Sequence, residues 1–288
     1  MIWTKLGEQV TMMRGVRSRM IHRFLPRYIP ASERPEKVGD YPELGPSDVE
    51  NARLFAGRES LVKYLAPELR GGTIAEVGVM YGDFSDFLLR TIEPEVFVAI
   101  DRFDAHTATL IWGKSPAEKF QGMTHREFYE RRFSDRGKQV RCEEGDSGEC
   151  LSRYPDRTFD MIYVDAGHDY ESVKRDADLS KQKIKLEGIL IFNDYIKYSH
   201  YEDCYYGIIP VVNNLVVNQG CEVMGFALQG DMYCDIAIRR RAKKKRVEFS
   251  VRKRSKASKC ITVSLKLCCS GVLQNPPAVW KRNTSLSK

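Results

Sequence analysis

Apolar runs of strand length alternate with helical patterns along the middle of the chain, and this alternation constrains the fold more than any other feature of the sequence. The runs are residues 73–77, 96–100, 140–144, 159–164 and 189–192. Strands that alternate with helices favour a parallel sheet with helices on both faces. Two later runs, 222–227 and 233–238, flank Gly230 and Asp231 and predict an antiparallel hairpin. We therefore expect an α/β, Rossmann-like fold with a seven-stranded, mostly parallel sheet and a C-terminal antiparallel hairpin.

A helix is expected before the first of these strands. Ser47 and Glu50 have the spacing of a capping box, and apolar residues then recur at near-helical intervals as far as Pro67. The pattern predicts one helix that leads from residue 47 into the sheet.

Charge is distributed unevenly along the chain. Residues 31–238 contain 37 acidic and 24 basic residues, whereas the two ends each contain one acid, with six basic residues in 1–30 and 16 in 239–288. This pattern predicts an acidic globular body with basic extensions. We expect a basic N-terminal segment and proline-rich linker over 1–46, a folded domain over 47–240, and a basic, disordered tail over 241–288 whose apolar run 261–267 is a candidate strand.

Several classes of protein are excluded or disfavoured by composition. No run of 18 or more apolar residues occurs, which argues against a membrane-spanning helix. The eight cysteines have no recurring spacing, so reduced thiols and a cytoplasmic location fit better than a disulfide scaffold or a zinc ribbon. The arginine-rich N-terminal segment leaves an organelle presequence or a membrane-surface helix open.

Polar residues and glycines follow the first three strands. Glu76 lies in the first strand, and Gly78 and Gly82 come after it at a spacing that lets the backbone turn sharply and approach a ligand. Asp101 ends the second strand, where a carboxylate accepts two hydrogen bonds from a ribose diol. The third strand is followed by Asp146 and Ser147, placed to meet an adenine edge. An ordinary strand-to-helix turn is the alternative interpretation of the glycine pair.

These residues together resemble the class I S-adenosylmethionine-dependent methyltransferases. The ExGxxxGxxS run from Glu76 to Ser85, the acid at Asp101, and Asp146 with Ser147 stand in that family's order. The runs FDMIYVDAGHDYESV (159–173), GILIFNDY (188–195) and YGIIPVVN (206–213) look most like the bacterial branch of macrocin-type and other sugar O-methyltransferases. The resemblance spans residues 50–240, about two thirds of the chain, and is specific to the cofactor more than to the acceptor.

The resemblance implies S-adenosylmethionine as the cofactor. Gly78 and Gly82 would line its methionine part, Asp101 its ribose, and Asp146 with Ser147 its adenine. The remaining residues of the implied cofactor set are Glu76, Ser85 and Asp165.

The fourth and fifth strands carry the candidate catalytic residues. Asp165, Asn193 and Asp194 would stand on one rim of the sheet as oxygen ligands for Mg²⁺, although several relatives of this branch have a second Asp at the position of Asn193. Asp165 could instead orient the cofactor or cap the next helix. His168 is a suitable base for the acceptor hydroxyl, with a structural histidine as the alternative. We therefore take His168, Asp165 and Asp194 as the catalytic candidates.

Aromatic residues are the candidates for framing the acceptor. They are Tyr195, His200, Tyr201 and the insertion 102–123 with Trp112.

The expected function is O-methylation of a sugar or another small hydroxylated acceptor. The alternatives are a methyltransferase acting on RNA or protein, with nonspecific phosphate contacts from the basic tail, and a catalytically silent, cofactor-binding interaction protein. The acidic body favours a small acceptor, so nucleic acid is not required, and a homo-oligomer stays open. Asn275-Pro276-Pro277 resembles the motif of amino-directed nucleic-acid methyltransferases, but Ala278 replaces the aromatic residue and the run lies beyond every strand.

Overall fold

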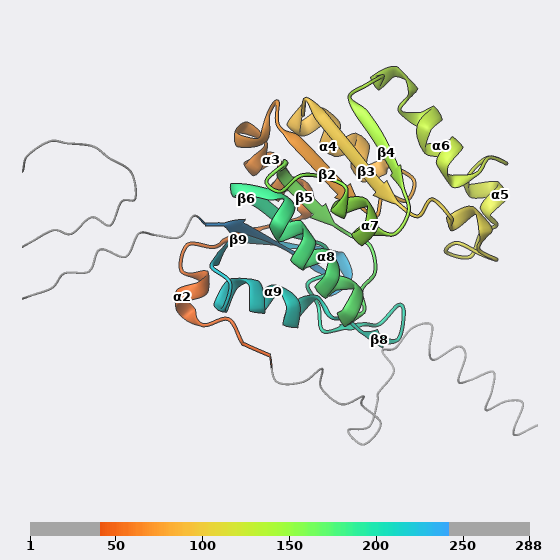
Figure 1. Ribbon diagram of the computed structural model, residues 1–288. Coiled ribbons are helices and arrows are strands. Elements are labelled where there is room, and N and C mark those ends of the chain that lie inside the picture. Colours follow the sequence, from red (N-terminus) through yellow and green to blue (C-terminus); the bar gives the residue numbers. More distant parts are fainter. Residues whose placement is uncertain (1–40, 242–288) are drawn as a thin grey trace, which may run out of the picture. The chain divides into compact units, whose positions relative to one another are not determined.

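The computed structural model describes residues 41–241 of the chain (Figure 1). The expectations for 1–40 and 242–288, including the basic tail and the apolar run 261–267, lie outside the described residues. Within the described part, no helix is both long enough and apolar enough to cross a membrane.

Eight strands of the described chain form one sheet, in the order β1-β9-β10-β6-β5-β2-β3-β4. The strands are β1 (Arg53–Phe55), β2 (Thr73–Val77), β3 (Val96–Asp101), β4 (Val140–Glu144), β5 (Phe159–Val164), β6 (Ile184–Phe192), β9 (Cys221–Leu228) and β10 (Cys234–Arg240). Neighbouring strands are parallel except at β10, which is antiparallel to both β6 and β9. The Rossmann-like α/β fold and its C-terminal antiparallel hairpin are therefore confirmed, with one strand more than predicted. A separate two-stranded hairpin consists of β7 (Tyr198–Ser199) and β8 (Cys204–Tyr205).

Helices cover both faces of the sheet (Figure 1). They are α2 (Pro46–Val49), α3 (Arg58–Leu69), α4 (Asp83–Ile92), α5 (Pro116–Lys119), α6 (His125–Arg132), α7 (Ser147–Ser152), α8 (Tyr170–Lys183) and α9 (Ile208–Val217). Short 3-10 turns lie at η1 (Ala105–Thr107), η2 (Ser134–Arg136) and η3 (Gly230–Met232). Side chains alternate across β2, so Ala75 and Val77 join the core under α7, α8 and α9, while Ile74 joins the core under α3 and α4.

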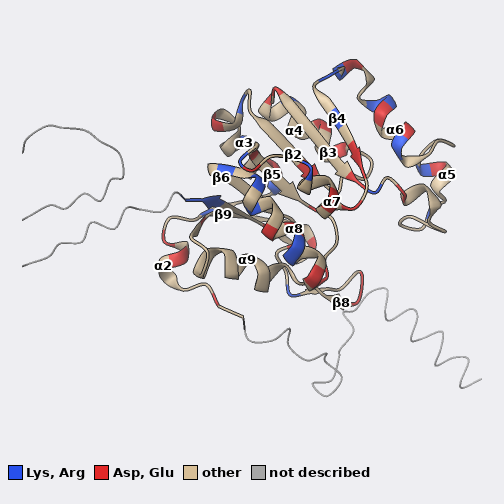
Figure 2. Ribbon diagram, viewed as in Figure 1, with Lys and Arg blue, Asp and Glu red and all other residues tan. Residues whose placement is uncertain are grey.

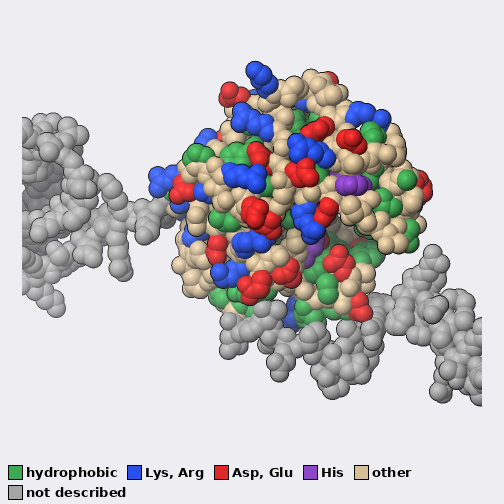
Figure 3. Space-filling model, turned by 45° about the vertical axis from the view of Figure 1, so that its right-hand side comes forward, with side chains coloured by type: hydrophobic (Ala, Val, Ile, Leu, Met, Phe, Trp, Pro, Cys, Tyr) green, Lys and Arg blue, Asp and Glu red, His purple; other side chains and the backbone are tan. Residues whose placement is uncertain are grey.

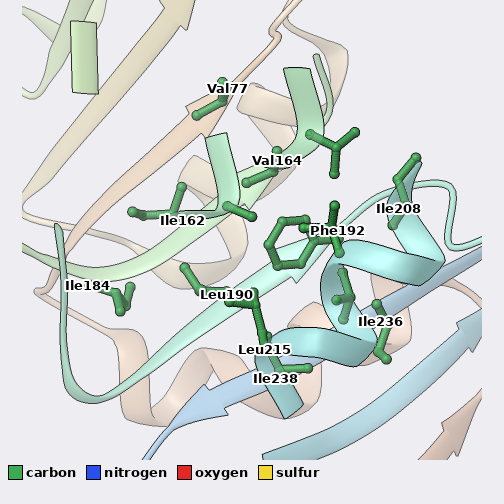
Figure 4. Close-up of a cluster of buried hydrophobic side chains, with 14 of the residues drawn as sticks. Val77, Ile162, Val164, Ile184, Leu190, Phe192, Ile208, Leu215, Ile236 and Ile238 are labelled. Carbon is green, nitrogen blue, oxygen red and sulfur yellow. The ribbon is translucent and has the colours of Figure 1, made fainter. Parts of the chain in front are cut away.

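The core beneath α9 holds the end of the sheet that carries the site. Phe192 of β6 and Ile236 of β10 lie against Ile208 and Leu215 of α9 (Figure 4). Each of these four side chains is at most 2% exposed. Close packing here fixes the ends of β5 and β6, from which the candidate catalytic residues project.

The expected single helix from residue 47 to Pro67 is wrong, and this segment supplies the eighth strand. Helix α2 ends at Val49, β1 follows, and α3 begins after Gly57 and runs past Pro67 to Leu69. Strand β1 pairs in parallel with β9, and Gly225 of β9 admits the backbone of Arg53, where a Cβ would overlap the Arg53 carbonyl.

The capping interaction of α2 also differs from the expected one. The Gly45 amide donates to Asp48 Oδ2 at 2.8 Å, two residues earlier than a cap between Ser47 and Glu50 would lie.

Candidate active site

One cleft of about 1180 Å³ lies at the carboxyl ends of the parallel strands β2 to β6. Parallel strands end at the same edge of a sheet, so residues far apart in the sequence meet there. Figure 2 shows acidic residues gathered where β3 and β4 end beside α7. In Figure 3, a hollow is visible on the face shown, with acidic side chains beside it.

Gly78 presses the loop after β2 against the end of β5. Its φ of 87° is in the left-handed region, and a Cβ would overlap the carbonyl oxygen of Asp165. The Gly78 amide donates to Ile100 O at 2.8 Å, and the Asp165 amide donates to Val77 O at 2.7 Å. Only glycine fits here, and Gly78 lines the cleft as the sequence predicted.

Asp101 holds the same loop from the other side. Its Oδ2 accepts hydrogen bonds from the amides of Val79 at 2.8 Å and Met80 at 3.3 Å, and its Oδ1 accepts one from Phe103 at 2.9 Å. The side chain is 17% exposed and lines the cleft. Asp101 therefore organises the loop, and the ribose contact stays a prediction. Its Oδ2 already accepts two hydrogen bonds, whereas Oδ1 accepts one and keeps a lone pair for a ligand.

Gly82 and Ser85 do not line the cleft formed by the described residues. A Cβ at Gly82 would meet the rings of Phe133 and Tyr129, so this glycine permits close packing against α6. Ser85 is fully buried and donates to Glu76 Oε2 at 2.5 Å. Direct contact of Gly82 and Ser85 with a cofactor, which the resemblance implied, is therefore replaced by packing and by support of Glu76.

Glu76 is a buried acid at the floor of the cleft. It is 2% exposed, and burial raises its pKa from 4.5 to about 8, although the hydrogen bond from Ser85 acts in the opposite direction. The Tyr129 hydroxyl donates to Ser85 Oγ at 2.8 Å and completes a chain of three side chains beneath the loop.

Asp146 and Ser147 line the cleft at the start of α7. Asp146 caps this helix, because its Oδ1 accepts from the Gly148 amide at 2.9 Å, and its Oδ2 lies 3.1 Å from Arg175 Nη2. Ser147 Oγ donates to Asp176 Oδ1 at 2.7 Å, and burial raises the pKa of Asp176. Both predicted residues are thus at the cleft, while contact with an adenine stays a prediction.

The catalytic candidates Asp165, His168 and Asp194 meet in one cluster. His168 Nε2 lies 3.8 Å from Asp165 Oδ1 and 3.6 Å from Asp194 Oδ2, and it is buried without a hydrogen-bond partner among the described residues. Burial alone would lower the pKa of His168, but the two carboxylates raise it overall. Burial and the nearby charge of Asp165 raise the pKa of Asp194 to about 6. The His168 ring is parallel to that of Tyr206, 6° between planes and 4.4 Å between centroids.

The predicted magnesium set of Asp165, Asn193 and Asp194 does not fit this geometry. Asn193 Nδ2 donates to Asp165 Oδ1 at 2.8 Å, so the amide nitrogen, and not its oxygen, faces the carboxylate. The oxygen of Asn193 accepts from Gln229 Nε2 at 3.3 Å and from the Tyr163 hydroxyl at 3.4 Å. Among residues 41–241, no group of three His, Cys, Asp or Glu side chains is arranged to hold a metal ion.

Several residues at the cleft carried no role in the sequence analysis. Arg58 at the start of α3 lies over the Phe84 ring at 4.3 Å, and both line the cleft. The other unassigned lining residues include Arg175, Glu202, Tyr206, Gln229, Asp231 and Tyr233. Their only sequence signal was proximity to recognised runs or to the turn at Gly230.

The residues proposed to frame the acceptor divide into two groups. Trp112 and Tyr201 line the cleft. Tyr195 instead packs against the core and donates to Asn213 Oδ1 at 2.5 Å, while the His200 ring lies against Tyr201 outside the lining of the described cleft.

Part of the chain matches a known family model. Residues 75–195 match the family model described as a methyltransferase domain. This segment contains Gly78, Asp101, Asp146 and the cluster around His168, whereas Arg58 and the lining residues from Ser199 to Tyr233 lie outside it. Residues 75–195 are therefore similar to methyltransferase domains, and the match does not single out a sugar O-methyltransferase branch.

Solved structures of methyltransferases are similar to the chain at low sequence identity. The N-methyltransferase NodS from Bradyrhizobium japonicum WM9 is 13% identical with a TM-score of 0.45, over 64% of this chain and 95% of NodS. Its complex with S-adenosyl-l-homocysteine is 13% identical with a TM-score of 0.44, over 64% and 85%. Precorrin-6y C5,15-methyltransferase from Geobacter metallireducens GS-15 is 12% identical with a TM-score of 0.44, over 64% and 86%. A search of curated proteins finds no match to this sequence.

Proposed function

We propose that this protein is an S-adenosylmethionine-dependent methyltransferase that transfers a methyl group to a hydroxyl of a sugar or another small hydroxylated acceptor. The observation that carries the proposal is the buried, unpartnered Nε2 of His168 between two carboxylates, in the same cleft as Gly78 and Asp101.

The residues at the cleft suit this cofactor. Gly78 and the neighbouring backbone would hold its methionine part, Asp101 its ribose, and Asp146 with Ser147 its adenine. When bound, S-adenosylmethionine supplies a methyl group on a positively charged sulfur. The cleft of about 1180 Å³ exceeds the 300–1,000 Å³ or so of most small-ligand pockets, which leaves space for an acceptor beside the cofactor.

His168 is the group that we assign as the base. An alcohol is a poor nucleophile while it keeps its proton, and a base near the acceptor removes that proton as the new bond forms. Asp165 and Asp194 raise the pKa of His168, which makes its neutral imidazole a stronger proton acceptor, and they stabilise the imidazolium that results. We assign Nε2, the nitrogen that lies between the two carboxylates, as the atom that takes the proton.

The charge of the cleft favours a small acceptor over RNA. Ten acidic residues and three arginines line it, and of the ten only Glu76 has a pKa as high as about 8. A polyanion would be repelled from such a surface.

The test is methyl transfer from labelled S-adenosylmethionine to separate pools of glycans, small phenols, RNA and protein. We expect label in the glycan or small-molecule pools, and His168→Ala should lower turnover by about 100-fold while cofactor affinity by calorimetry stays unchanged. A chelator should leave turnover unchanged, because Asn193 turns its oxygen away from Asp165.

The matched control is His106→Ala, since His106 bonds the Phe103 carbonyl and is not among the described lining residues. Full turnover by His168→Ala would remove His168 from the chemistry, and label confined to RNA or protein would contradict the proposed acceptor.

A further inference from the structure

One wall of the cleft combines exposed aromatic rings with carboxylates. We define the acceptor wall as the cleft-lining residues of 194–206 and 229–233, namely Asp194, Ser199, Tyr201, Glu202, Tyr206, Gln229, Gly230, Asp231 and Tyr233. Three of these nine are acids, three are tyrosines, and none is lysine or arginine. All three arginines that line the cleft come from elsewhere, at Arg58, Arg102 and Arg175.

Two tyrosines of the acceptor wall, Tyr201 and Tyr233, line the cleft as a stacked pair, whereas Tyr206 is buried. Tyr201 is 67% exposed, and its ring stacks on that of Tyr233 with 5.8 Å between centroids and 22° between planes. Tyr233 is fixed by a hydrogen bond of 2.8 Å between its hydroxyl and Ser199 Oγ. Such a surface suits the apolar face of a sugar ring, and aromatic faces also attract cations.

Glu202 places a charge between these rings and the proposed base. Its Oε2 accepts a hydrogen bond from the Tyr206 hydroxyl at 2.8 Å. The ring of the same Tyr206 stacks on the His168 ring. The Glu202 amide donates to Ser199 Oγ at 3.1 Å, which ties the residue to the hydroxyl that also holds Tyr233. The carboxylate is therefore held in place beside both the aromatic surface and His168.

We infer that the acceptor is positively charged, namely an amine-bearing sugar or sugar-like molecule, and that the acceptor wall binds its ammonium group. A neutral sugar would need the rings but not the acids, whereas a protonated amine uses both. No arginine or lysine belongs to the acceptor wall, and Asp194 already faces His168 at 3.6 Å. The charges that remain for a cationic acceptor are those of Glu202 and Asp231. This inference deepens the proposed function and rests on it for the position of the acceptor.

The experiment measures equilibrium binding and does not depend on turnover. Methyl 2-amino-2-deoxyglucoside, its N-acetyl derivative and methyl glucoside are titrated into the full chain with S-adenosylhomocysteine present, and binding is followed by ligand-observed NMR. We expect the amine to bind about tenfold more tightly than either neutral sugar, as one partly exposed ion pair with a cation–π contact provides.

Two charge-neutralising variants make the test specific. Glu202→Gln keeps an acceptor for the Tyr206 hydroxyl and should remove most of the preference for the amine. Asp203→Asn removes a neighbouring acid that is not among the described lining residues, and it should keep that preference.

The inference is overturned if the amine does not bind, or binds no more tightly than the neutral sugars. It is also overturned if Glu202→Gln and Asp203→Asn reduce the preference for the amine equally. Failure of the proposed function is seen separately, as no binding of S-adenosylmethionine in calorimetry of the same protein.

Discussion

Glu76→Gln should make the free energy of unfolding less dependent on pH between about pH 5.5 and 7.5. Glu76 is 2% exposed, and burial raises its pKa from 4.5 to about 8, so the folded protein keeps this proton at a pH where the unfolded chain has lost it. In that interval, raising the pH favours the unfolded state by about 1.4 kcal/mol per pH unit for this one group. Glutamine cannot titrate, yet its side-chain oxygen can still accept the hydrogen bond from Ser85.

The expected magnitude follows from these values. Between about pH 5.5 and 7.5, the free energy of unfolding of the wild type should fall relative to that of Glu76→Gln by about 3 kcal/mol. The difference should stop growing above pH 8, where the folded carboxyl also ionises. Asp194 and Asp235 have pKa values raised to about 6 and about 7, but they are present in both proteins, so their effect cancels.

Urea unfolding of both proteins, followed by circular dichroism over this pH range, measures the difference directly. Ser85→Ala provides a second check, because loss of the donor that lowers the pKa of Glu76 should move the plateau to higher pH. Parallel curves of stability against pH for the wild type and Glu76→Gln would refute the reasoning, since they would mean that Glu76 ionises at the same pH in the folded and unfolded chains.

Three further predictions concern the cleft. Gly78→Ala should abolish cofactor binding in calorimetry and lower the melting temperature, because its Cβ would overlap the Asp165 carbonyl oxygen. The control Gly71→Ala, at a similar φ of 71° with open space around it, should cost only about 1–2 kcal/mol of stability and leave binding intact. Equal effects of the two variants would contradict the argument from this overlap. Asp101→Ala should weaken S-adenosylmethionine binding by about ten- to a hundredfold and also lower the melting temperature, because three backbone amides lose their acceptor; unchanged affinity would remove Asp101 from the cofactor site. Turnover should fall as the pH drops through the pKa of His168. Asp194→Asn removes a carboxylate that raises this pKa, so the acidic limb of the pH–rate profile should move to lower pH. An acidic limb at the same pH in both proteins would mean that Asp194 does not act on the titrating group.

Much of the fold was accessible from the sequence because hydrophobic periodicity is a local property. The predicted runs 140–144 and 159–164 coincide with β4 and β5, and the antiparallel hairpin around Gly230 is β9 with β10. Strand β1 was missed because three residues carry too short a pattern, and only pairing with β9, far along the chain, makes them a strand.

Part of the candidate site could also be predicted from the sequence. Gly78, Asp101, Asp146 and the cluster around His168 were found because parallel strands bring their ends to one edge, which the order of the elements already implies.

What each polar group bonds to was decided only by the tertiary structure. The sequence suggested that Asn193 would ligate a metal and that Ser85 would contact the cofactor, but the first turns its oxygen to Gln229 and the second lies beneath the loop against Glu76. Hydrogen bonds of this kind join side chains whose distance and direction are set by the packing of helices on both faces of the sheet, and no local pattern of residues encodes that packing.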